Sequence, residues 1–320
     1  ASDVYKRQHM KFGIGFANTV TFVSGDGAVE LGTAAEDAGF DSLWTVEHIV
    51  YPEGYESTYP YAPDGKMPGS GDSPIPDPLI WLAYVAAHTT TLKLATGISL
   101  LPERHPVTYA KEVATLDMMS NGRVMLGVGI GWLREEFDAL DVPWEGRARR
   151  TEEYAEVMRT LWESDDASFH GEFIDFDHIS SNPKPTNGRV PIHTGGHSRA
   201  AAERAGRMGD GFFPAKGDIA ELFEIARQTA ADNGRDPETI EMTGLPSSVC
   251  NIRLTSSGSP SSQLENVGEA NRLFNVMASS CRSFWGNTAS TSITPTLSKG
   301  GAWICPINWL RLKSRDSDQA

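Results

Sequence analysis

Residues 92–131 read LKLATGISLLPERHPVTYAKEVATLDMMSNGRVMLGVGIG, and this stretch decides the fold class. Leu92–Leu101 is a run of mostly apolar residues that predicts a strand, and His105–Ser120 has the length and composition of a helix closed by Asn-Gly. Arg123–Gly131 then places Val, Leu, Val and Ile opposite a row of glycines, a period of two that is typical of a strand. Strand, helix and strand in this order predict a parallel β/α/β unit.

The same alternation extends in both directions from this unit. It predicts five further strands, over Lys11–Ala17, Ser42–His48, Val190–Thr194, Gly211–Ala215 and Ile240–Leu245. It predicts further helices over Asp26–Gly39, Pro78–Thr90, Leu133–Ser164 (interrupted at Pro143), Arg199–Gly209 and Ile219–Asn233, with a small hairpin over Ser168–Ile179. Seven strands exceed a flavodoxin-like sheet, and 320 residues suffice for a (β/α)8 barrel, which needs roughly 250. We therefore expect an α/β fold, a (β/α)8 TIM barrel whose last β/α unit is missing or replaced.

Composition divides the chain into three parts. Residues 1–9 read as an assembly scar or a short disordered tail, and residues 10–249 as the barrel domain. Residues 250–320 are rich in Ser, Thr, Asn and Gly, and their three tryptophans follow no period. For this tail we favour a shifted reading frame or a chimeric assembly over a lineage-specific extension. Without an eighth unit the barrel would keep an unpaired strand edge.

Charge and cysteine usage restrict the partners and the compartment. The net charge is −14 and no basic stripe is visible, which argues against a nucleic-acid partner. No run of 18 apolar residues is present, so we expect no membrane span. All three cysteines lie after residue 249 without a Cys-x-x-Cys pair, so the sequence predicts no metal site and a cytoplasmic location.

Glu47-His48 is the first candidate for chemistry, because it ends the second predicted strand. Barrel enzymes place catalytic groups at the carboxyl ends of their strands, and a histidine there could give or take a proton near neutral pH. The alternative is a structural histidine at a strand end. Glu47 is expected on the opposite face, bracing the structure. His105, His170, His178 and His193 are scattered, and we interpret them as structural.

Thr194–Ser198 reads Thr-Gly-Gly-His-Ser between the fifth strand and a helix. The glycines let the backbone approach a ligand, Ser198 can cap the helix, and free N–H groups with the helix dipole then favour a phosphate. The alternative is a plain capped turn.

Three strands keep small residues on one face, which either leaves room for a flat ligand or marks bulges and tight packing. These residues are Gly13, Gly15 and Ala17; Ala95 and Gly97; and Gly127, Gly129 and Gly131. A nicotinamide-dinucleotide fingerprint is rejected, because Trp132 stands where the third glycine is needed and no acidic residue follows at a strand end.

The long segment 49–76 is rich in Pro, Gly and Asp and holds four of the eight tyrosines, namely Tyr51, Tyr55, Tyr59 and Tyr61. Loops of this length in compact domains are often lids or binding loops, so we interpret it as a substrate lid. The alternative is a surface loop that packs on itself.

Taken together, these runs resemble the luciferase-like monooxygenase family, in family order over residues 10–249. The resemblance is closest to the branch that uses the deazaflavin coenzyme F420. The matching runs are Trp44–His48, Tyr59–Gly65, Asp77–Ala83, Ala95–Ile98, Leu101–Pro106, Ala110–Asp117, Ser120–Arg123, Gly127–Trp132, Glu135–Phe137, Leu161-Trp162, Gly195–Ser198 and Gly209–Gly211.

The resemblance implies a barrel with its cofactor at the carboxyl-end mouth and a bulge in the third strand behind the ring system. The implied cofactor residues are Thr96, Gly97 and Ile98 at the bulge, Gly129 and Gly131 in the cleft, and Gly195, Gly196 and Ser198 at the phosphate. His48 matches the family histidine near the ring, where it could protonate or orient a substrate. Some relatives have an acidic residue where this chain has Trp132, so no acid role is carried over.

The resemblance implies hydride transfer between reduced F420 and a small organic substrate. One alternative is a monooxygenase that uses FMN and molecular oxygen. Another is a non-catalytic flavin-binding protein or an inactive, truncated barrel. Relatives are often dimers, so a homodimer is a further expectation.

Overall fold

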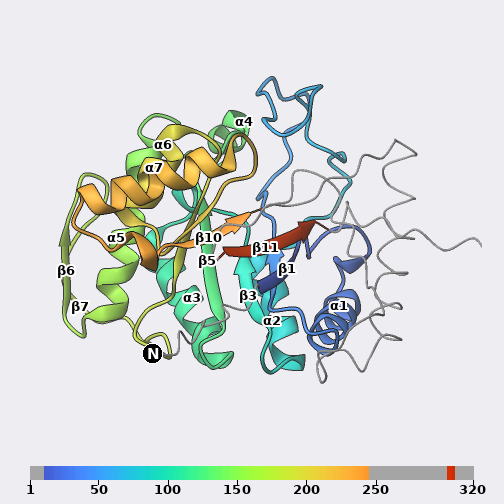
Figure 1. Ribbon diagram of the computed structural model, residues 1–320, viewed down its shortest axis with the longest axis horizontal. Coiled ribbons are helices and arrows are strands. Elements are labelled where there is room, and N and C mark those ends of the chain that lie inside the picture. The colour runs from blue at the N-terminus through green and yellow to red at the C-terminus, as the bar shows by residue number, and fades with distance from the viewer. Residues whose placement is uncertain (1–10, 245–300, 307–320) are drawn as a thin grey trace, which may run out of the picture.

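The computed structural model describes residues 11–244 and 301–306 (Figure 1). Its main strands are β1 (Lys11–Gly15), β2 (Ser42–Thr45), β3 (Lys93–Thr96), β4 (Ser99–Leu100), β5 (Val124–Gly129), β8 (Ile192–Gly195), β9 (Gly211–Phe213), β10 (Glu241–Gly244) and β11 (Gly301–Pro306). A separate hairpin consists of β6 (Ala167–His170) and β7 (Asp175–Ile179), as predicted. The helices are α1 (Gly25–Asp37), α2 (Pro78–His88), α3 (Pro106–Met119), α4 (Arg134–Ala139), α5 (Arg147–Glu163), α6 (Arg199–Met208) and α7 (Ile219–Asp232), with short 3-10 turns η1 (Val20–Phe22), η2 (Leu101–Glu103) and η3 (Pro237–Thr239).

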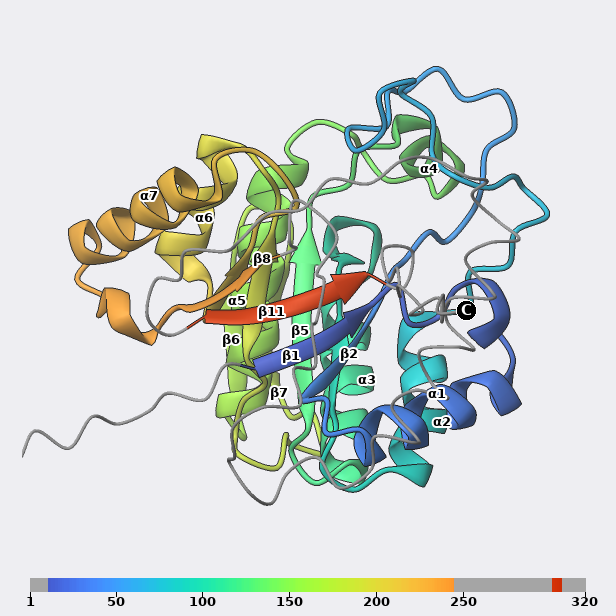
Figure 2. The same ribbon diagram turned by 45° about the vertical axis from the view of Figure 1, so that its right-hand side comes forward.

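The main strands form one closed parallel sheet. Its order is β3-β2-β1-β11-β10-β9-β8-β5-β4, and the additional pairing of β3 with β5 closes the ring. Because β3 and β4 both lie beside β5, they are two parts of one interrupted strand, and the nine segments occupy eight strand positions. The helices surround this sheet, with α1 and α2 on one side and α6 and α7 on the other (Figure 2). The predicted (β/α)8 barrel is confirmed.

The position of the eighth strand corrects one expectation. β11 pairs in parallel with β1, from Lys11 opposite Ala302 to Gly15 opposite Pro306, and with β10, where Met242 lies opposite Gly301. The edge between β10 and β1, which we expected to be unpaired, is therefore occupied by six residues of the 250–320 tail. Residues 1–9 and the rest of that tail lie outside the described residues, so their predicted nature stays a prediction.

Side chains at helix starts explain several boundaries. Ser24, Asp77, Ser198 and Asp218 each precede a helix and accept a hydrogen bond from an amide of its first turn. The helix predicted over Leu133–Ser164 is divided into α4 and α5, as the proline at 143 indicated.

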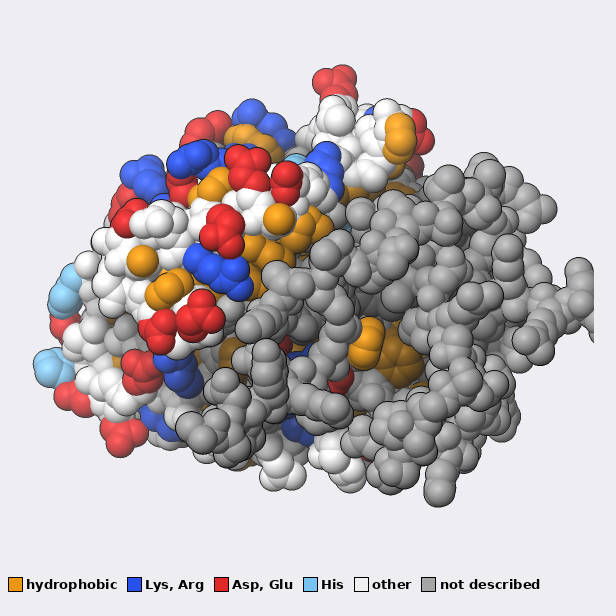
Figure 3. Space-filling view, viewed as in Figure 1, with side chains coloured by type: hydrophobic (Ala, Val, Ile, Leu, Met, Phe, Trp, Pro, Cys, Tyr) orange, Lys and Arg blue, Asp and Glu red, His pale blue; other side chains and the backbone are white. Residues whose placement is uncertain are grey.

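The core lies between the sheet and the helices. Its largest cluster joins the buried faces of α1, α2, α3 and α5 to β1, β2, β3, β5 and β8, and a smaller cluster joins α6 and α7 to β9 and β10. On the outer surface over α6 and α7, acidic and basic side chains are intermixed (Figure 3). Within the described residues, no helix combines the length and apolar character that crossing a bilayer requires.

Candidate active site at the carboxyl end of the barrel

The interruption of the third strand shapes one wall of the barrel mouth. β3 ends at Thr96, whose hydroxyl donates to the carbonyl of Gly127 at 2.7 Å, and the amide of Gly97 donates to the carbonyl of Thr45 at 2.6 Å. The Gly97–Ile98 peptide bond is cis, and the strand resumes as β4. The predicted irregularity at residues 96–98 is therefore present.

The glycines of neighbouring strands make room for the side chain of Ile98. A Cβ atom on Gly129 would lie 1.8 Å from Cδ1 of Ile98, and one on Gly195 would lie 2.7 Å from its Cγ2. A Cβ on Gly127 would lie 2.1 Å from the carbonyl oxygen of Thr96. These three positions therefore serve close packing between strands, which for Gly127 and Gly129 was the alternative to room for a flat ligand. Ile98, Gly129 and Gly195 form one continuous wall.

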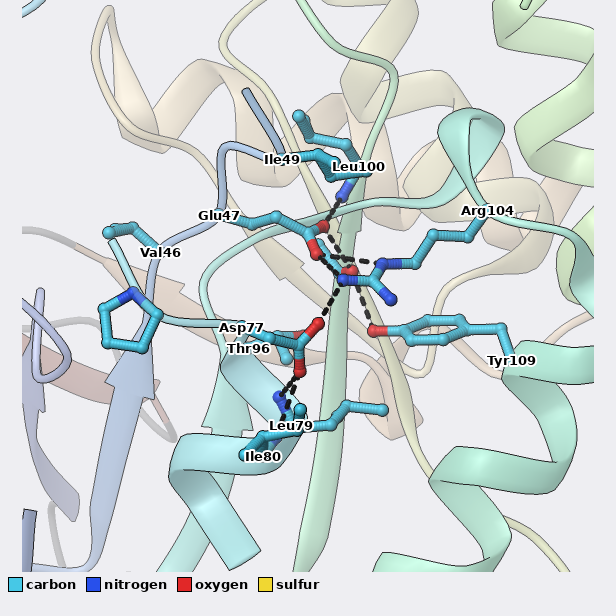
Figure 4. A network of polar contacts seen from close by, with 12 residues as sticks. Val46, Glu47, Ile49, Asp77, Leu79, Ile80, Thr96, Leu100, Arg104 and Tyr109 are labelled. Atoms are coloured by element: carbon cyan, nitrogen blue, oxygen red, sulfur yellow. Dashed lines mark hydrogen bonds and ion pairs between the residues drawn. The ribbon is translucent and has the colours of Figure 1, made fainter. Parts of the chain in front are cut away.

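Glu47 has the bracing role that was predicted, through contacts with β4 and Arg104 (Figure 4). It is 5 % exposed, and one carboxylate oxygen accepts from the hydroxyl of Ser99 at 2.7 Å and from the amide of Leu100 at 2.5 Å. The other oxygen accepts from the guanidinium of Arg104, with Nε at 2.9 Å. Glu47 thereby connects the end of β2 to β4, directly after the interruption of the third strand.

Arg104 extends the same network to the start of α2 and to α3. Its Nη2 lies 2.7 Å from a carboxylate oxygen of Asp77, the residue that caps α2, and its guanidinium lies over the ring of Tyr109 at 4.8 Å (Figure 4). The hydroxyl of Tyr109 donates to Ser99 at 2.7 Å. Burial alone would lower the pKa of Arg104, but the charge of Glu47 and the hydrogen bonds to Glu47 and Asp77 outweigh it and hold this pKa above its ordinary value.

His48 follows β2 at the carboxyl end of the sheet and contacts a buried carboxylate of α4. Its Nδ1 is 2.8 Å from Oε2 of Glu136, whose side chain is fully buried. The other oxygen of Glu136 accepts from the amides of Ile49 at 2.6 Å and Val50 at 3.2 Å. The indole of Trp132 meets the His48 ring edge to face, with centroids 5.7 Å apart.

Glu103, at the end of η2, is a second buried carboxyl group near this pair. Both of its oxygens are buried and have no hydrogen-bond partner within the described residues. Burial raises its pKa to about 9, and the nearby carboxylates of Glu136 and Glu47 add to this increase. Glu103 is therefore a neutral carboxylic acid at pH 7, held beside an ionic network.

The segment between β8 and α6 forms a cradle with free donors. Ser198 caps α6 by accepting from the amide of Ala201 at 3.2 Å, and Gly196 has a φ of +129°, a conformation that side chains rarely adopt. Among the described residues, the amides of 197–200 find no acceptor, and Nδ1 of His197 has no partner. Free amides at a helix start suit an anion.

The tyrosine-rich segment 49–76 rises beyond the carboxyl ends of the strands, beside α4 (Figure 2). Tyr55 and Tyr59 both contact Trp132 edge to face, with centroids 5.7 and 5.1 Å apart. Tyr59 also contacts Tyr61, which reaches His197 of the cradle at 5.2 Å. The segment thus packs on itself and also spans the mouth from His48 to the cradle. Its role as a lid stays a prediction.

Further contacts anchor the segment at both ends of this span. Oε1 of Glu135 accepts from the amides of Glu56 at 2.7 Å and Ser57 at 3.0 Å, and the ammonium of Lys216 donates to the carbonyl of Pro60. Burial raises the pKa of Tyr59 to about 12, so this hydroxyl stays neutral.

The sequence did not indicate two of the side chains assembled here. Glu136 and Glu103 lie on different elements from His48, and their proximity follows only from the closed barrel. For Glu136 the sequence did contain a signal. Glu136 lies directly before Phe137 in the short helix α4, and Phe137 is buried. A carboxylate beside a buried aromatic residue needs a partner, and its partner is His48.

Comparison with known proteins agrees with this geometry. A family model described as "Luciferase-like monooxygenase" matches residues 10–253. An uncharacterized protein of Mycobacterium tuberculosis is 37 % identical over 197 residues, 62 % of this chain and 68 % of the relative. An FMNH2-dependent dimethylsulfone monooxygenase of Pseudomonas fluorescens is 31 % identical over 211 residues, 64 % of this chain and 53 % of the relative.

A solved structure of an F420-dependent secondary alcohol dehydrogenase, in complex with an F420-acetone adduct, is also similar. It has a TM-score of 0.61 and 25 % sequence identity, and the match covers 74 % of this chain and 68 % of that one. The family model covers most of the chain, and the barrel has the same fold as this enzyme. The chain belongs to the luciferase-like monooxygenase family, and its similar proteins include F420-dependent oxidoreductases and FMNH2-dependent monooxygenases.

Proposed function

We propose that the protein transfers a hydride between coenzyme F420 and a small organic substrate, with His48 as the catalytic residue. The observation that carries the proposal is the contact of His48, which follows β2 at the carboxyl end of the sheet, with the fully buried carboxylate of Glu136, whose Oε2 lies 2.8 Å from Nδ1. Oxidation of an alcohol, or reduction of a ketone, requires a group that takes or gives the proton at the substrate oxygen. An imidazole fixed at the mouth suits that task.

The cofactor residues are proposed in three groups. Thr96, Gly97 and Ile98 would support the ring system, with Gly129 and Gly131 beside them. Gly195, Gly196 and Ser198 would hold the phosphate, which fits the free amides of residues 197–200 and the unpartnered Nδ1 of His197. When bound, F420 would supply the hydride acceptor or donor, and the protein would supply placement and a proton.

The tyrosine segment would exclude water from this site. Tyr55, Tyr59 and Tyr61 form a continuous aromatic layer from Trp132 to His197. Closing a mouth with aromatic rings lowers the local dielectric and strengthens the interactions of the groups beneath it. Tyr51 contacts Tyr55 at 5.8 Å and would complete the layer.

A second candidate is a monooxygenase that uses reduced FMN and molecular oxygen. It is favoured by the similarity to the FMNH2-dependent dimethylsulfone monooxygenase. The same wall and cradle would hold FMN, because both cofactors carry a phosphate on a side chain of a tricyclic ring.

A cytoplasmic location is proposed as well, and it agrees with residues 1–249, which contain no cysteine. A homodimer stays a prediction, which analytical ultracentrifugation tests.

The experiment mixes the protein with oxidised F420 and a panel of small secondary alcohols, starting from propan-2-ol, and follows loss of the deazaflavin absorbance. His48→Ala should lower the rate by about 10²-fold or more, because the proton acceptor is lost. His170→Ala is the matched control, since this histidine lies on the exposed hairpin. Equal rates for wild type and His48→Ala would remove His48 from the mechanism. Absence of turnover with F420, with oxygen uptake in reduced FMN, would favour the second candidate.

A further inference from the structure

We propose that Glu136 is the positioning residue of this site, which keeps the proton of neutral His48 on Nδ1 and leaves Nε2 as the nitrogen that exchanges protons with substrate. The proposal rests on the proposed role of His48. Glu136 lies on α4, not on the strand that precedes His48. Its contacts determine which imidazole nitrogen reacts and connect this ring to the start of the lid segment.

The hydrogen bonds of Glu136 determine the direction of its contact with His48. Oε1 accepts from two backbone amides, of Ile49 and Val50, and Oε2 faces Nδ1 of His48 at 2.8 Å. An ionised carboxylate can only accept, so Nδ1 must carry the proton that it shares with Glu136. A neutral imidazole has one N–H, and Nε2 is then the free base.

Burial keeps the Glu136 carboxylate in this arrangement. Its side chain is fully buried, whereas the side chain of His48 keeps 12 % of its surface exposed. A buried carboxylate without donors would be costly, and the two amides and Nδ1 satisfy it. Trp132 lies edge to face against the imidazole and limits rotation of the ring.

The same carboxylate connects His48 to the lid segment. Ile49 and Val50 are the first residues of this segment, and both amides bind the oxygen of Glu136 that does not contact His48. A displacement at the start of the segment would therefore pull on the carboxylate that orients the imidazole. Closure of the segment and orientation of the base are coupled through one side chain.

Glu135 provides a matched comparison, because it anchors the same segment without contacting His48. It accepts from the amides of Glu56 and Ser57, seven residues further along the chain than the amides of Ile49 and Val50 that Glu136 binds. A variant at 135 loosens the segment alone. A variant at 136 loosens it and also releases the imidazole.

The test determines which ring nitrogen of His48 carries the proton, from the ¹⁵N NMR chemical shifts of the full chain. The signals of His48 are assigned by their loss in His48→Ala. Wild type should show Nδ1 protonated and Nε2 unprotonated at a pH where the ring is neutral. Glu136→Met removes the acceptor and should give exchange between both tautomers. Glu135→Met should leave the wild-type pattern. Glu136→Gln is a second variant, for use if Glu136→Met does not fold. Its single amide oxygen can accept either from His48 or from the two backbone amides, so it should give a tautomer pattern between those of wild type and Glu136→Met.

Turnover with F420 and propan-2-ol supplies the second readout. Glu136→Met should lower kcat by about 10²-fold, the range of a misplaced proton-transfer group, with a smaller change in KM. Glu135→Met should act mainly on KM. An unchanged tautomer in Glu136→Met, or an equal change in Glu135→Met, overturns the proposal. Because the spectra need no cofactor, absence of F420 turnover in wild type would refute the proposed function and leave this test valid.

Discussion

The buried carboxyl group of Glu103 should make the protein less stable as the pH rises. Its pKa is about 9 in the folded protein, against 4.5 for an unperturbed glutamate. A carboxyl group with a raised folded pKa keeps a proton that the unfolded chain releases. Stability is therefore lost between pH 4.5 and 9, at about 1.4 kcal/mol for each pH unit. Between pH 6 and pH 8 this contribution is about 2 to 3 kcal/mol.

Glu103→Gln should remove that loss, since an amide of the same shape does not titrate. The assay is urea unfolding of wild type and variant at pH 6 and pH 8. From pH 6 to pH 8, the free energy of unfolding of the variant should rise by about 2 to 3 kcal/mol relative to that of wild type, which corresponds to roughly 3–6 °C in thermal midpoint. Glu30→Gln, at an exposed position of α1, is the control and should show no such gain. Parallel pH dependences of wild type and Glu103→Gln would refute a neutral, buried Glu103.

Three further substitutions test other parts of the account. Arg104→Met leaves a buried carboxylate without its cation and should cost about 3 kcal/mol in urea unfolding, whereas Arg134→Met, which breaks an exposed pair, should cost less than about 1 kcal/mol. Ser198→Ala removes the cap of α6 and should cost about 1 kcal/mol, together with weaker binding of inorganic phosphate in a calorimetric titration. Tyr61→Ala removes the contact between the lid segment and the cradle, so hydrogen exchange of residues 56–66 should report an opening free energy lower by about 1 kcal/mol. Unchanged exchange there would mean that this contact does not hold the segment.

The barrel could be predicted from the sequence because each strand and helix has a local signal. The alternation over residues 92–131 indicates a β/α/β unit without knowledge of its neighbours. The eighth strand was missed because Gly301–Pro306 has no helical pattern beside it in the sequence. Its run Ala302–Cys305 is apolar and matches a buried parallel strand, but such a short run is equally compatible with other structures.

The site was only partly predictable, for a physical reason. His48, the cradle and the tyrosines are each marked by their place at a strand end, a helix start or a long loop. The contacts of His48 with Glu136, and of Glu47 with Arg104, join residues 88 and 57 positions apart. Sequence spacing carries no information about such pairs. The glycines of β5 did not indicate an open cleft. The side chain of Ile98 fills the space beside Gly129, so this glycine allows close packing between strands.

The proposed hydride transfer requires that the wall, the cradle and the lid segment of this mouth bind F420. The most direct measurement is a fluorescence titration of each cofactor separately with the full chain, under identical buffer and salt. The account predicts saturable quenching of F420, weaker or absent quenching of FMN, and loss of F420 affinity in Ser198→Ala. Tight binding of FMN without binding of F420 would contradict it.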